Sequence, residues 1–115
     1  MKPGAKVAFL QHGLFADSYT WIMRGSQSLS VVLAKQGYDV WMGNNRGNQF
    51  SRQNKNFDPS SDAAKYFDYS FYELGKYDAP TQIDYVLKTT GHSKLSYIGH
   101  SQGTSQMFSQ LSETT

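Results

Sequence analysis

The chain of 115 residues contains no cysteine, so disulfides, thiolate catalysis and cysteine-ligated zinc are excluded from it. It has no apolar run near the roughly 18 residues that a membrane-spanning helix needs, and its mean hydropathy is −0.58. We therefore expect no transmembrane segment. The formal net charge is only +2, without the clustered basic stripe that nucleic acid requires, so we expect no nucleic-acid partner.

Motifs for nucleotides, metals and export are missing as well. Neither G-x-G-x-x-G nor G-x-x-x-x-G-K-[ST] occurs, which leaves nucleotide binding without support. The three histidines, His12, His92 and His100, lack metal-ligand spacing, and we predict no metal and no cofactor. Residues 1–10 do not contain the basic, apolar and small-residue parts of a secretory signal peptide in order. These residues by themselves predict no compartment.

The residues that are present suffice for one folded unit. A hydrophobic fraction of 38% and an aromatic fraction of 15% are enough to build a core. A length of 115 residues permits one domain at most, so we predict a single α/β unit over residues 1–115. Residues 106–115 have the pattern of a helix that runs on without a glycine stop, and Thr114 and Thr115 cap nothing. This indicates a chain cut from something longer; a frayed tail is the alternative interpretation.

Predicted strands and helices alternate along the chain. They follow one another in the order strand 6–11, helix 28–34, strand 38–42, helix 70–88, strand 94–99 and helix 102–111. Gly37 and Gly91 are placed to end the first two helices, and Ser70 and Glu73 form a capping box at the start of the second. Pro80 predicts either a kink or a short first helix and a second that begins near Asp78. The alternation predicts a parallel sheet with right-handed crossovers.

The pentapeptide Gly99-His100-Ser101-Gln102-Gly103 fits G-x-S-x-G and lies where a predicted strand meets a predicted helix. A turn this sharp leaves no room for side chains two residues before and two residues after the serine, so Gly99 and Gly103 are required there. Ser101 would then have a strained backbone and an exposed hydroxyl, with the N–H groups of the following helix aimed at a developing negative charge. The pattern predicts Ser101 as a nucleophile. An ordinary glycine-rich turn with a solvated serine is the alternative.

A second motif, Leu10-Gln11-His12-Gly13-Leu14, follows the first predicted strand, where an α/β-hydrolase supplies an oxyanion donor. We expect the backbone N–H groups of Leu14 and Gln102 to hold the oxygen of a tetrahedral intermediate. The His12 side chain is predicted to be structural, bonded to a nearby carbonyl. A pairing of His12 with Ser101 is disfavoured.

With these stretches the chain resembles the acid lipase family, the gastric and lysosomal acid lipases and their relatives. The shared stretches cover nearly the whole chain in order: 10–14, 37–41, 43–48, 51–52, 70–71, 76–78, 83–85 and 99–104. The resemblance implies an α/β-hydrolase fold in which Ser101 is the nucleophile and the amides of Leu14 and Gln102 form the oxyanion hole. It implies hydrolysis of acyl-ester lipids, such as triacylglycerol or sterol esters, through an acyl-enzyme. It also implies transient contact with a lipid surface and a secreted or lysosomal location.

The resemblance covers only the first part of that fold. In α/β-hydrolases the triad acid and histidine follow the nucleophile, whereas residues 102–115 contain neither Asp nor His. We predict a partial fold whose C-terminal half is missing, no triad acid or histidine in this chain, and little activity from it alone. It should be marginally stable, because its sheet exposes an edge and an apolar face. The alternatives are a non-catalytic binding protein, and a serine hydrolase of another acyl substrate such as a thioester.

The remaining polar and aromatic side chains have structural interpretations. Residues 43–61 are predicted as a long loop that Asn44, Arg46 and Arg52 order by hydrogen bonds, rather than a substrate site. Of the other histidines, His100 is expected to point toward the sheet and His92 to lie about 20 Å from the elbow. The following aromatic residues are predicted to pack in the core and on helix faces, not as a stacking surface: Tyr66, Phe67, Tyr69, Phe71, Tyr72 and Tyr77.

Overall fold

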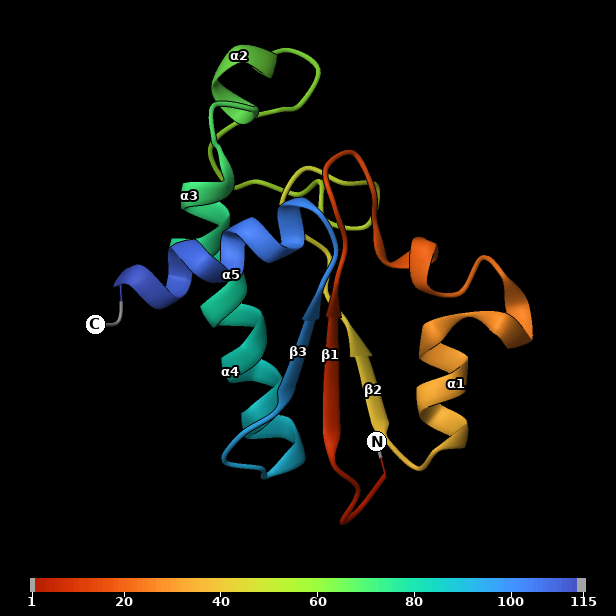
Figure 1. Ribbon diagram of the computed structural model, residues 1–115. Helices are drawn as coiled ribbons and strands as arrows, with labels where there is room; N and C mark the ends of the chain where they lie inside the picture. The colour runs from red at the N-terminus through yellow and green to blue at the C-terminus, as the bar shows by residue number, and fades with distance from the viewer. Residues whose placement is uncertain (1, 114–115) are drawn as a thin grey trace.

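The computed structural model describes residues 2–113. Its centre is a parallel sheet in the order β2-β1-β3, made of β1 (Val7–Gln11), β2 (Asp39–Met42) and β3 (Ser96–Gly99) (Figure 1). Every residue of β1 is buried, since this central strand is covered on both faces, as parallel strands usually are. The predicted parallel α/β fold is confirmed, and the three strands end within two residues of the predicted positions.

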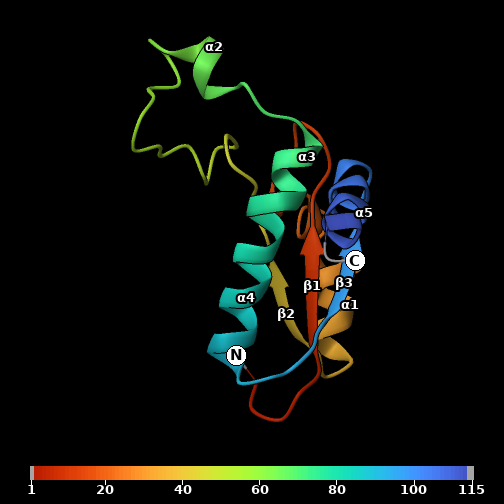
Figure 2. The same cartoon turned by 90° about the vertical axis from the view of Figure 1, so that its left-hand side faces the viewer.

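Helices cover both faces of the sheet. α1 (Leu29–Lys35) lies beside β2 on the face to which Met42 belongs. α4 (Ala79–Thr90) lies on the other face, where Val86 packs with Phe9. Figure 2 shows α1 and α4 on opposite sides of the strands. The chain therefore runs from β1 to one neighbour over one face, and then past β1 to its other neighbour over the opposite face.

The start and the end of the second predicted helix are confirmed. α3 (Phe71–Glu73) begins at the capping box, in which the Tyr72 N–H donates to the Ser70 hydroxyl at 3.2 Å. The Ser70 N–H in turn donates to the Glu73 carboxylate at 2.7 Å. Gly91 ends α4 in the left-handed conformation with φ +75, which glycine adopts without steric cost.

A π-helical turn, η3 (Leu74–Asp78), joins α3 to α4. Such a turn is wider than an α-helical one, because its hydrogen bonds span five residues. Pro80 has no N–H to donate to the carbonyl of Lys76, four residues earlier, so one α-helical hydrogen bond cannot form there. The π turn includes Lys76, the residue whose carbonyl lacks this bond. Of the two predicted outcomes, the structure has the short first helix and a second that begins at Ala79, joined by a π turn rather than a break.

The last helix, α5 (Gln102–Glu113), continues two residues beyond its predicted end. Thr114 and Thr115, which were expected to leave this helix uncapped, lie outside the described residues. α5 crosses η3 at Gly75, where an added Cβ would lie 2.5 Å from the carbonyl oxygen of Gln106. The two helices thus approach each other as closely as their backbones allow. Within residues 2–113, no helix is long and apolar enough to cross a membrane.

The predicted long loop is present, and three short elements of the structure are not predicted by the sequence. They are the 3-10 turns η1 (Ser18–Trp21) and η2 (Gly25–Gln27) and the helix α2 (Ala63–Tyr66). Segments of three or four residues are too short to show a hydrophobic period. α2 stands away from the sheet in Figure 1, and the Tyr66 hydroxyl joins it to the loop through the Arg52 carbonyl at 2.5 Å.

The prediction for the aromatic residues is wrong for most of them. Tyr66 is buried and Tyr69 is half-buried, but the others are exposed: Phe67, Phe71, Tyr72 and Tyr77. For Phe71, Tyr72 and Tyr77 the reason is that α3 and η3 present Leu74 and Gly75 to α5, which turns these aromatic side chains toward solvent. The Lys76 ammonium lies over the Tyr72 and Tyr77 rings at 5.6 and 5.5 Å. These aromatic side chains make cation–π contacts at the surface rather than a core.

We predict that Gly75→Ala destabilises the protein by about 1–3 kcal/mol, the usual cost of overpacking a close contact. The added Cβ would meet the Gln106 carbonyl oxygen and, at 2.8 Å, the Ser109 Cβ, so α5 must shift. Denaturant unfolding measures the change. Helix propensity alone would make Gly→Ala stabilising by about 0.5–1 kcal/mol. A rise in stability would therefore show that the two helices do not meet as closely as described.

Candidate active site

Ser101 occupies a sharp corner between β3 and α5. Its φ is +53, in the left-handed region that a non-glycine residue rarely adopts. Its side chain is exposed, and no side chain within residues 2–113 hydrogen-bonds its hydroxyl. This strained conformation arises because only residues 100 and 101 connect the end of β3 to the start of α5.

The two flanking glycines lie where no side chain fits. A Cβ on Gly99 would lie 2.8 Å from the carbonyl carbon of Gly103. A Cβ on Gly103 would lie 2.5 Å from the carbonyl oxygen of Gln11 and 2.7 Å from that of His12. The start of α5 therefore packs directly on the backbone at the end of β1, which brings the corner at Ser101 against the loop that follows β1.

The loop after β1 lies beside Ser101 because β1 and β3 are neighbouring parallel strands, so their carboxyl ends meet at one edge of the sheet. From there the chain after β1 leads to α1, and the chain after β3 leads to α5. Gln11 pairs with Gly99, and the His100 N–H donates to the Gln11 carbonyl at 3.1 Å. A Cβ on Gly13 would lie 3.1 Å from the Ser101 Cβ. In open α/β sheets, ligands bind at the carboxyl ends of strands where the order of connections reverses. Ser101 and Gly13 meet at such a point.

Two backbone N–H groups at this point are available to a ligand. Neither the Leu14 nor the Gln102 N–H donates a hydrogen bond to another residue in the range 2–113. Gln102 is the first residue of α5, whose N-terminal N–H groups have no acceptor within the helix. Leu14 and Gln102 both line one groove of about 560 Å³.

That groove has apolar and polar walls. Leu14, Phe15, Phe67 and Leu74 form its apolar part. Its polar lining comes from the loops after β1 and β2, from the segment before α3 and from the first residue of α5: His12, Asp17, Asn45, Arg46, Asn48, Gln49, Tyr69, Ser70 and Gln102. The groove therefore has Leu14 and Gln102 in its lining together with the exposed side chains of Phe15 and Phe67, a combination that suits an extended molecule with one polar group.

His12 is buried, with 4% of its surface exposed, and it is structural, as predicted. Its Nδ1 lies 2.8 Å from the Gly13 carbonyl oxygen, while its Nε2 accepts the Asn45 N–H at 3.0 Å and lies 3.1 Å from the Asn48 Nδ2. Both ring nitrogens are engaged, so His12 does not pair with Ser101. Burial lowers the pKa of His12 below its usual 6.5, although the bond to Gly13 and the charge of Asp17 raise it.

The other two histidines do not serve Ser101 as bases either. The expectation that His100 points toward the sheet is wrong, because its side chain is exposed and its Nδ1 would lie 3.2 Å from a Cβ on Gly13. The strand ends at Gly99, so His100 lies beyond the last strand pair, where no layer covers it. His92 precedes β3, at the end of the strand away from Ser101; its distance of about 20 Å stays a prediction. Among the described residues, no three His, Asp or Glu side chains are grouped as metal ligands.

The side-chain amides of Asn45 and Gln106 form a buried pair next to the site. The Asn45 Nδ2 donates to the Gln106 Oε1 at 2.7 Å, and the Gln106 Nε2 donates back to the Asn45 Oδ1 at 3.1 Å. Asn45 is 3% exposed and Gln106 0%. Because the Asn45 backbone also holds the His12 ring, these contacts connect the loop after β1, the loop after β2 and α5.

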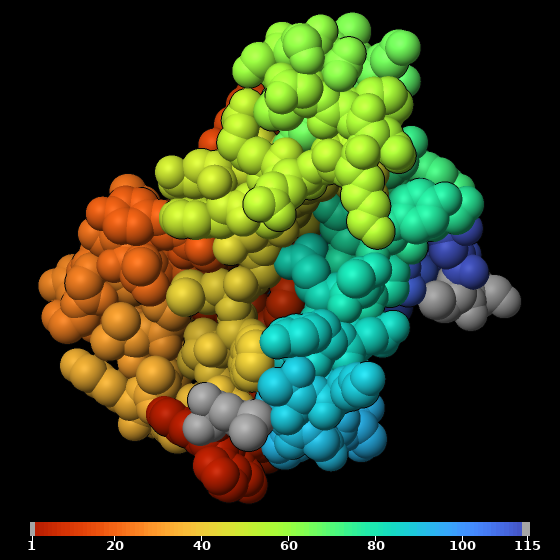
Figure 3. All heavy atoms as spheres, turned by 180° about the vertical axis from the view of Figure 1, so that it is seen from behind, coloured from red at the N-terminus to blue at the C-terminus, as the bar shows by residue number. Residues whose placement is uncertain are grey.

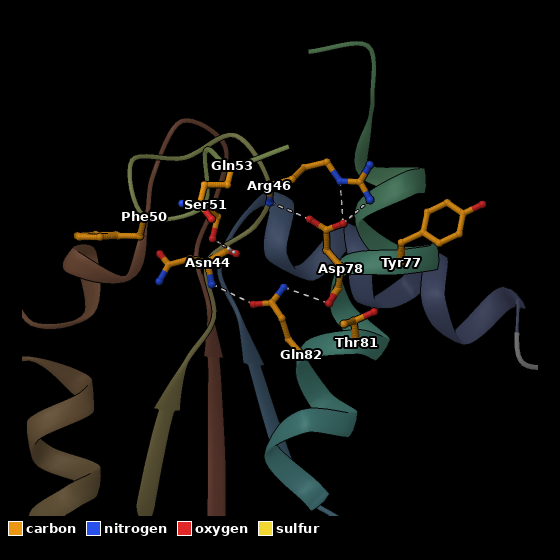
Figure 4. A pocket seen from close by; sticks show the side chains of 9 residues that line it. All are labelled: Asn44, Arg46, Phe50, Ser51, Gln53, Tyr77, Asp78, Thr81 and Gln82. Carbon is orange, nitrogen blue, oxygen red and sulfur yellow. Dashed lines mark hydrogen bonds and ion pairs between the residues drawn. The ribbon is translucent and has the colours of Figure 1, made fainter. Parts of the chain in front are cut away.

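Arg46 fixes the long loop on η3. Its Nε donates to the Asp78 Oδ1 at 2.8 Å, its Nη2 lies 2.5 Å from the same oxygen, and its backbone N–H donates to the Asp78 Oδ2 at 2.8 Å (Figure 4). The guanidinium also lies over the Tyr69 ring, 5.5 Å from its centroid. Asn44 donates from its backbone N–H to the Gln82 Oε1 at 2.9 Å. The prediction that Asn44 and Arg46 order the loop is confirmed; Arg52 takes part through its backbone carbonyl.

A second hollow lies on the α4 side of the sheet. Its volume is about 470 Å³, and Phe9, Trp41, Tyr85 and Val86 form its apolar lining. Figure 3 shows it between the β2 segment, in yellow, and α4, in teal. It is separate from the groove that Leu14 and Gln102 line, and we assign it no role in the site.

Sequence profiles identify the fold. The profile of the α/β hydrolase fold family matches residues 9–113. The chain belongs to the α/β hydrolase fold family. Its similarity to acid lipases, inferred from short motifs, is confirmed over most of the chain.

Three relatives illustrate this similarity. The gastric triacylglycerol lipase of Mus musculus is 48% identical over 99 residues, which are 85% of this chain and 25% of that protein. Lipase 1 of Drosophila melanogaster is 48% identical over 108 residues, 93% of this chain and 24% of that protein. The lysosomal acid lipase/cholesteryl ester hydrolase of Homo sapiens is 45% identical over 108 residues, 93% and 27% respectively. The chain thus spans about a quarter of the length of these relatives.

Sequence reasoning missed the supporting contacts of the site. The partners Asn45 and Gln106 are 61 positions apart, and Arg46 and Asp78 are 32 apart. No signal in the sequence indicated Gln106, because the apolar residues of the predicted helix, Met107, Phe108 and Leu111, lie on the opposite side from it. The direct contact of two amides was not predictable, since it depends on how closely α5 approaches the loop after β2.

We predict that, as the pH decreases below 6.5, the free energy of unfolding of the protein falls more steeply than that of the His12→Asn variant. The pKa of folded His12 is lowered, so below pH 6.5 the unfolded chain binds more protons than the folded one, and the free energy of unfolding falls. Above pH 6.5 the contribution of His12 is constant. The difference in slope is at most about 1.36 kcal/mol per pH unit. Urea unfolding of both proteins between pH 5 and 7.5 measures it, and parallel curves would contradict the prediction.

Proposed function

We propose that this chain carries the nucleophile and the oxyanion hole of a serine hydrolase that acts on acyl-ester lipids. The single observation on which this depends is the left-handed, exposed Ser101 beside two backbone N–H groups that have no acceptor among the described residues. Membership of the α/β hydrolase fold family supports it, as do relatives named triacylglycerol lipase and cholesteryl ester hydrolase.

In this proposal the Ser101 oxygen attacks the ester carbonyl carbon, and its proton passes to a general base. The carbonyl oxygen becomes an oxyanion that accepts hydrogen bonds from the Leu14 and Gln102 N–H groups. Expulsion of the alcohol, which takes up the proton, leaves an acyl group on Ser101, and water then releases the carboxylic acid. One oxyanion donor is typically worth about 10²–10³ in rate.

The groove of about 560 Å³ is the part of the site that suits a lipid. A chain attached to the carbonyl carbon must lead away from the Leu14 and Gln102 N–H groups, and both residues line the groove. Leu14, Phe15, Phe67 and Leu74 give it an apolar wall. Burial of each methylene in such surroundings contributes about 0.8 kcal/mol, so a long acyl chain would add considerable affinity.

The general base is the missing component. The described side chains give the Ser101 hydroxyl no hydrogen bond, and both nitrogens of His12 are engaged elsewhere. We therefore expect residues 1–115 by themselves to turn over esters very slowly, with only the contribution of the oxyanion hole and of binding.

We predict that a fluorophosphonate probe modifies Ser101 at least about tenfold faster than any other serine of the chain. The reason is that the negative charge that develops on the phosphonyl oxygen accepts hydrogen bonds from two N–H groups. Mass spectrometry of peptides from the labelled protein locates the modified residue. Ser101→Ala should abolish this label, and Ser105→Ala, on the next turn, is the matched control. Uniform slow labelling of all exposed serines would favour a non-catalytic binding protein. Faster labelling by long-chain alkyl phosphonates than by short ones would support a lipid substrate.

We predict that Leu14→Pro slows Ser101 labelling by about 10²-fold, since proline removes the N–H of this residue. The turn tolerates proline: the Ala16 N–H bonds to the Gly13 carbonyl at 3.2 Å and Phe15 has φ +59, as in a turn that favours proline before the left-handed residue. Leu14→Ala shortens the side chain but keeps the N–H, and should label at least tenfold faster than Leu14→Pro. Equal rates would exclude Leu14 as an oxyanion donor.

A further inference from the structure

We propose that His12 is a positioning residue, whose Nδ1–H holds the Gly13 carbonyl and so aims the Leu14 N–H at the oxyanion. This inference rests on the proposed function, since it concerns the oxyanion hole. In this inference the buried His12 side chain does not touch the substrate. It sets the direction of the Leu14 N–H, which would bind the reacting oxygen.

The geometry of one peptide unit connects the two groups. In a trans peptide the carbonyl of one residue and the N–H of the next lie in one plane and point in opposite directions. No cis peptide bond occurs among the described residues. Two hydrogen bonds anchor the Gly13 carbonyl oxygen, one to the His12 Nδ1 at 2.8 Å and one from the Ala16 N–H at 3.2 Å. Anchoring this carbonyl therefore fixes the direction of the Leu14 N–H.

The imidazole is held in the one tautomer that performs this task. A backbone N–H is always a donor, so the Nε2 that meets the Asn45 N–H at 3.0 Å must be an acceptor. The proton of neutral His12 then resides on Nδ1, where it donates to Gly13. The Asn48 side chain lies 3.1 Å from the same Nε2 as a second donor. Because the ring is almost fully buried, no solvent competes for either nitrogen.

The turn needs this support because its own backbone is unfavourable. Phe15 has φ +59, which is costly for an aromatic residue, and its side chain is 99% exposed, so packing does not offset the cost. Leu14 is exposed as well. Among residues 2–113, the Ala16 N–H makes the one backbone hydrogen bond within the turn. The bond from His12 adds a second anchor to the same Gly13 carbonyl, and it comes from a buried side chain.

Two substitutions separate the donor of His12 from its acceptor. His12→Asn places an amide nitrogen near the position of Nδ1, and so restores the bond to Gly13 without an acceptor for Asn45. His12→Gln places an amide oxygen near the position of Nε2, and so keeps the acceptor for Asn45 without the donor to Gly13. A purely structural role, in which His12 only holds the loop after β2, predicts that the glutamine variant is the better one.

The experiment measures the direction of the Leu14 N–H by residual dipolar couplings in the 115-residue chain, together with the phosphonylation rate of Ser101. We expect His12→Asn to keep the Leu14 coupling close to its original value, and to label at least tenfold faster than His12→Gln, in which the coupling changes. Couplings of Val7 to Leu10 test whether each variant keeps the sheet. An unchanged Leu14 coupling in folded His12→Gln would overturn the inference.

Nitrogen-15 shifts of the His12 ring in the unsubstituted protein supply a measurement that does not depend on the variants. They should show a protonated Nδ1 and an unprotonated Nε2 near neutral pH. The opposite tautomer would overturn the inference even if neither variant folds. If Ser101 is never labelled while the couplings behave as expected, the proposed function fails and the control of the Leu14 N–H by His12 stands.

Discussion

The close contact of backbone with backbone at Gly103 is the constraint on which the rest of the site depends. A helix can start this near the end of a neighbouring strand only if its first turn carries no side chain there, and the carbonyls of Gln11 and His12 occupy the space that a Cβ would need. This contact puts the amino end of α5 beside the loop after β1. It also forces the left-handed backbone at Ser101, since the chain has no longer path from β3 into α5.

Polar groups, rather than hydrocarbon, hold the layer beneath this corner. Asn45, Gln106 and His12 satisfy one another and the surrounding backbone almost completely. A buried amide left without a partner costs about 1–3 kcal/mol, so such a network tolerates few arrangements other than the native one. An apolar cluster of similar volume would permit several packings and would fix the loops less accurately.

The fold could be predicted because its signals are local. Apolar runs bounded by glycine gave β1, β2 and β3, and the capping box at Ser70 marked a helix start that the structure has. The strained backbone at Ser101 follows from two glycines within five residues. The failures share one physical cause, which is dependence on distant partners. Which side of α3 and η3 faces inward is decided by α5, so the exposure of Phe71 and Tyr77 could not be derived from their own spacing.

The same limit applies to the candidate site. Leu14 and Gln102 could be named from motif positions, whereas the contacts of Arg46 with Asp78 and of Asn45 with Gln106 join segments 32 and 61 residues apart. His100 was expected to point toward the sheet as the neighbour of Ser101 in the elbow, but the strand ends at Gly99 and its side chain is exposed. Motifs thus predict candidate backbone donors, but not the side chains that keep those groups in place.

The π turn at Leu74–Asp78 restricts how the chain length can vary. Each residue of an α-helix turns the chain by about 100°, so deleting one residue from this turn would restore regular helix and rotate α3 by that angle relative to α4. Gly75 would then no longer contact α5, and Asp78 would no longer bond to Arg46. The exposed segment between Arg52 and Asp62 makes no comparable contacts and can gain or lose residues. Insertions and deletions among homologous chains should therefore be rare in the first segment and common in the second.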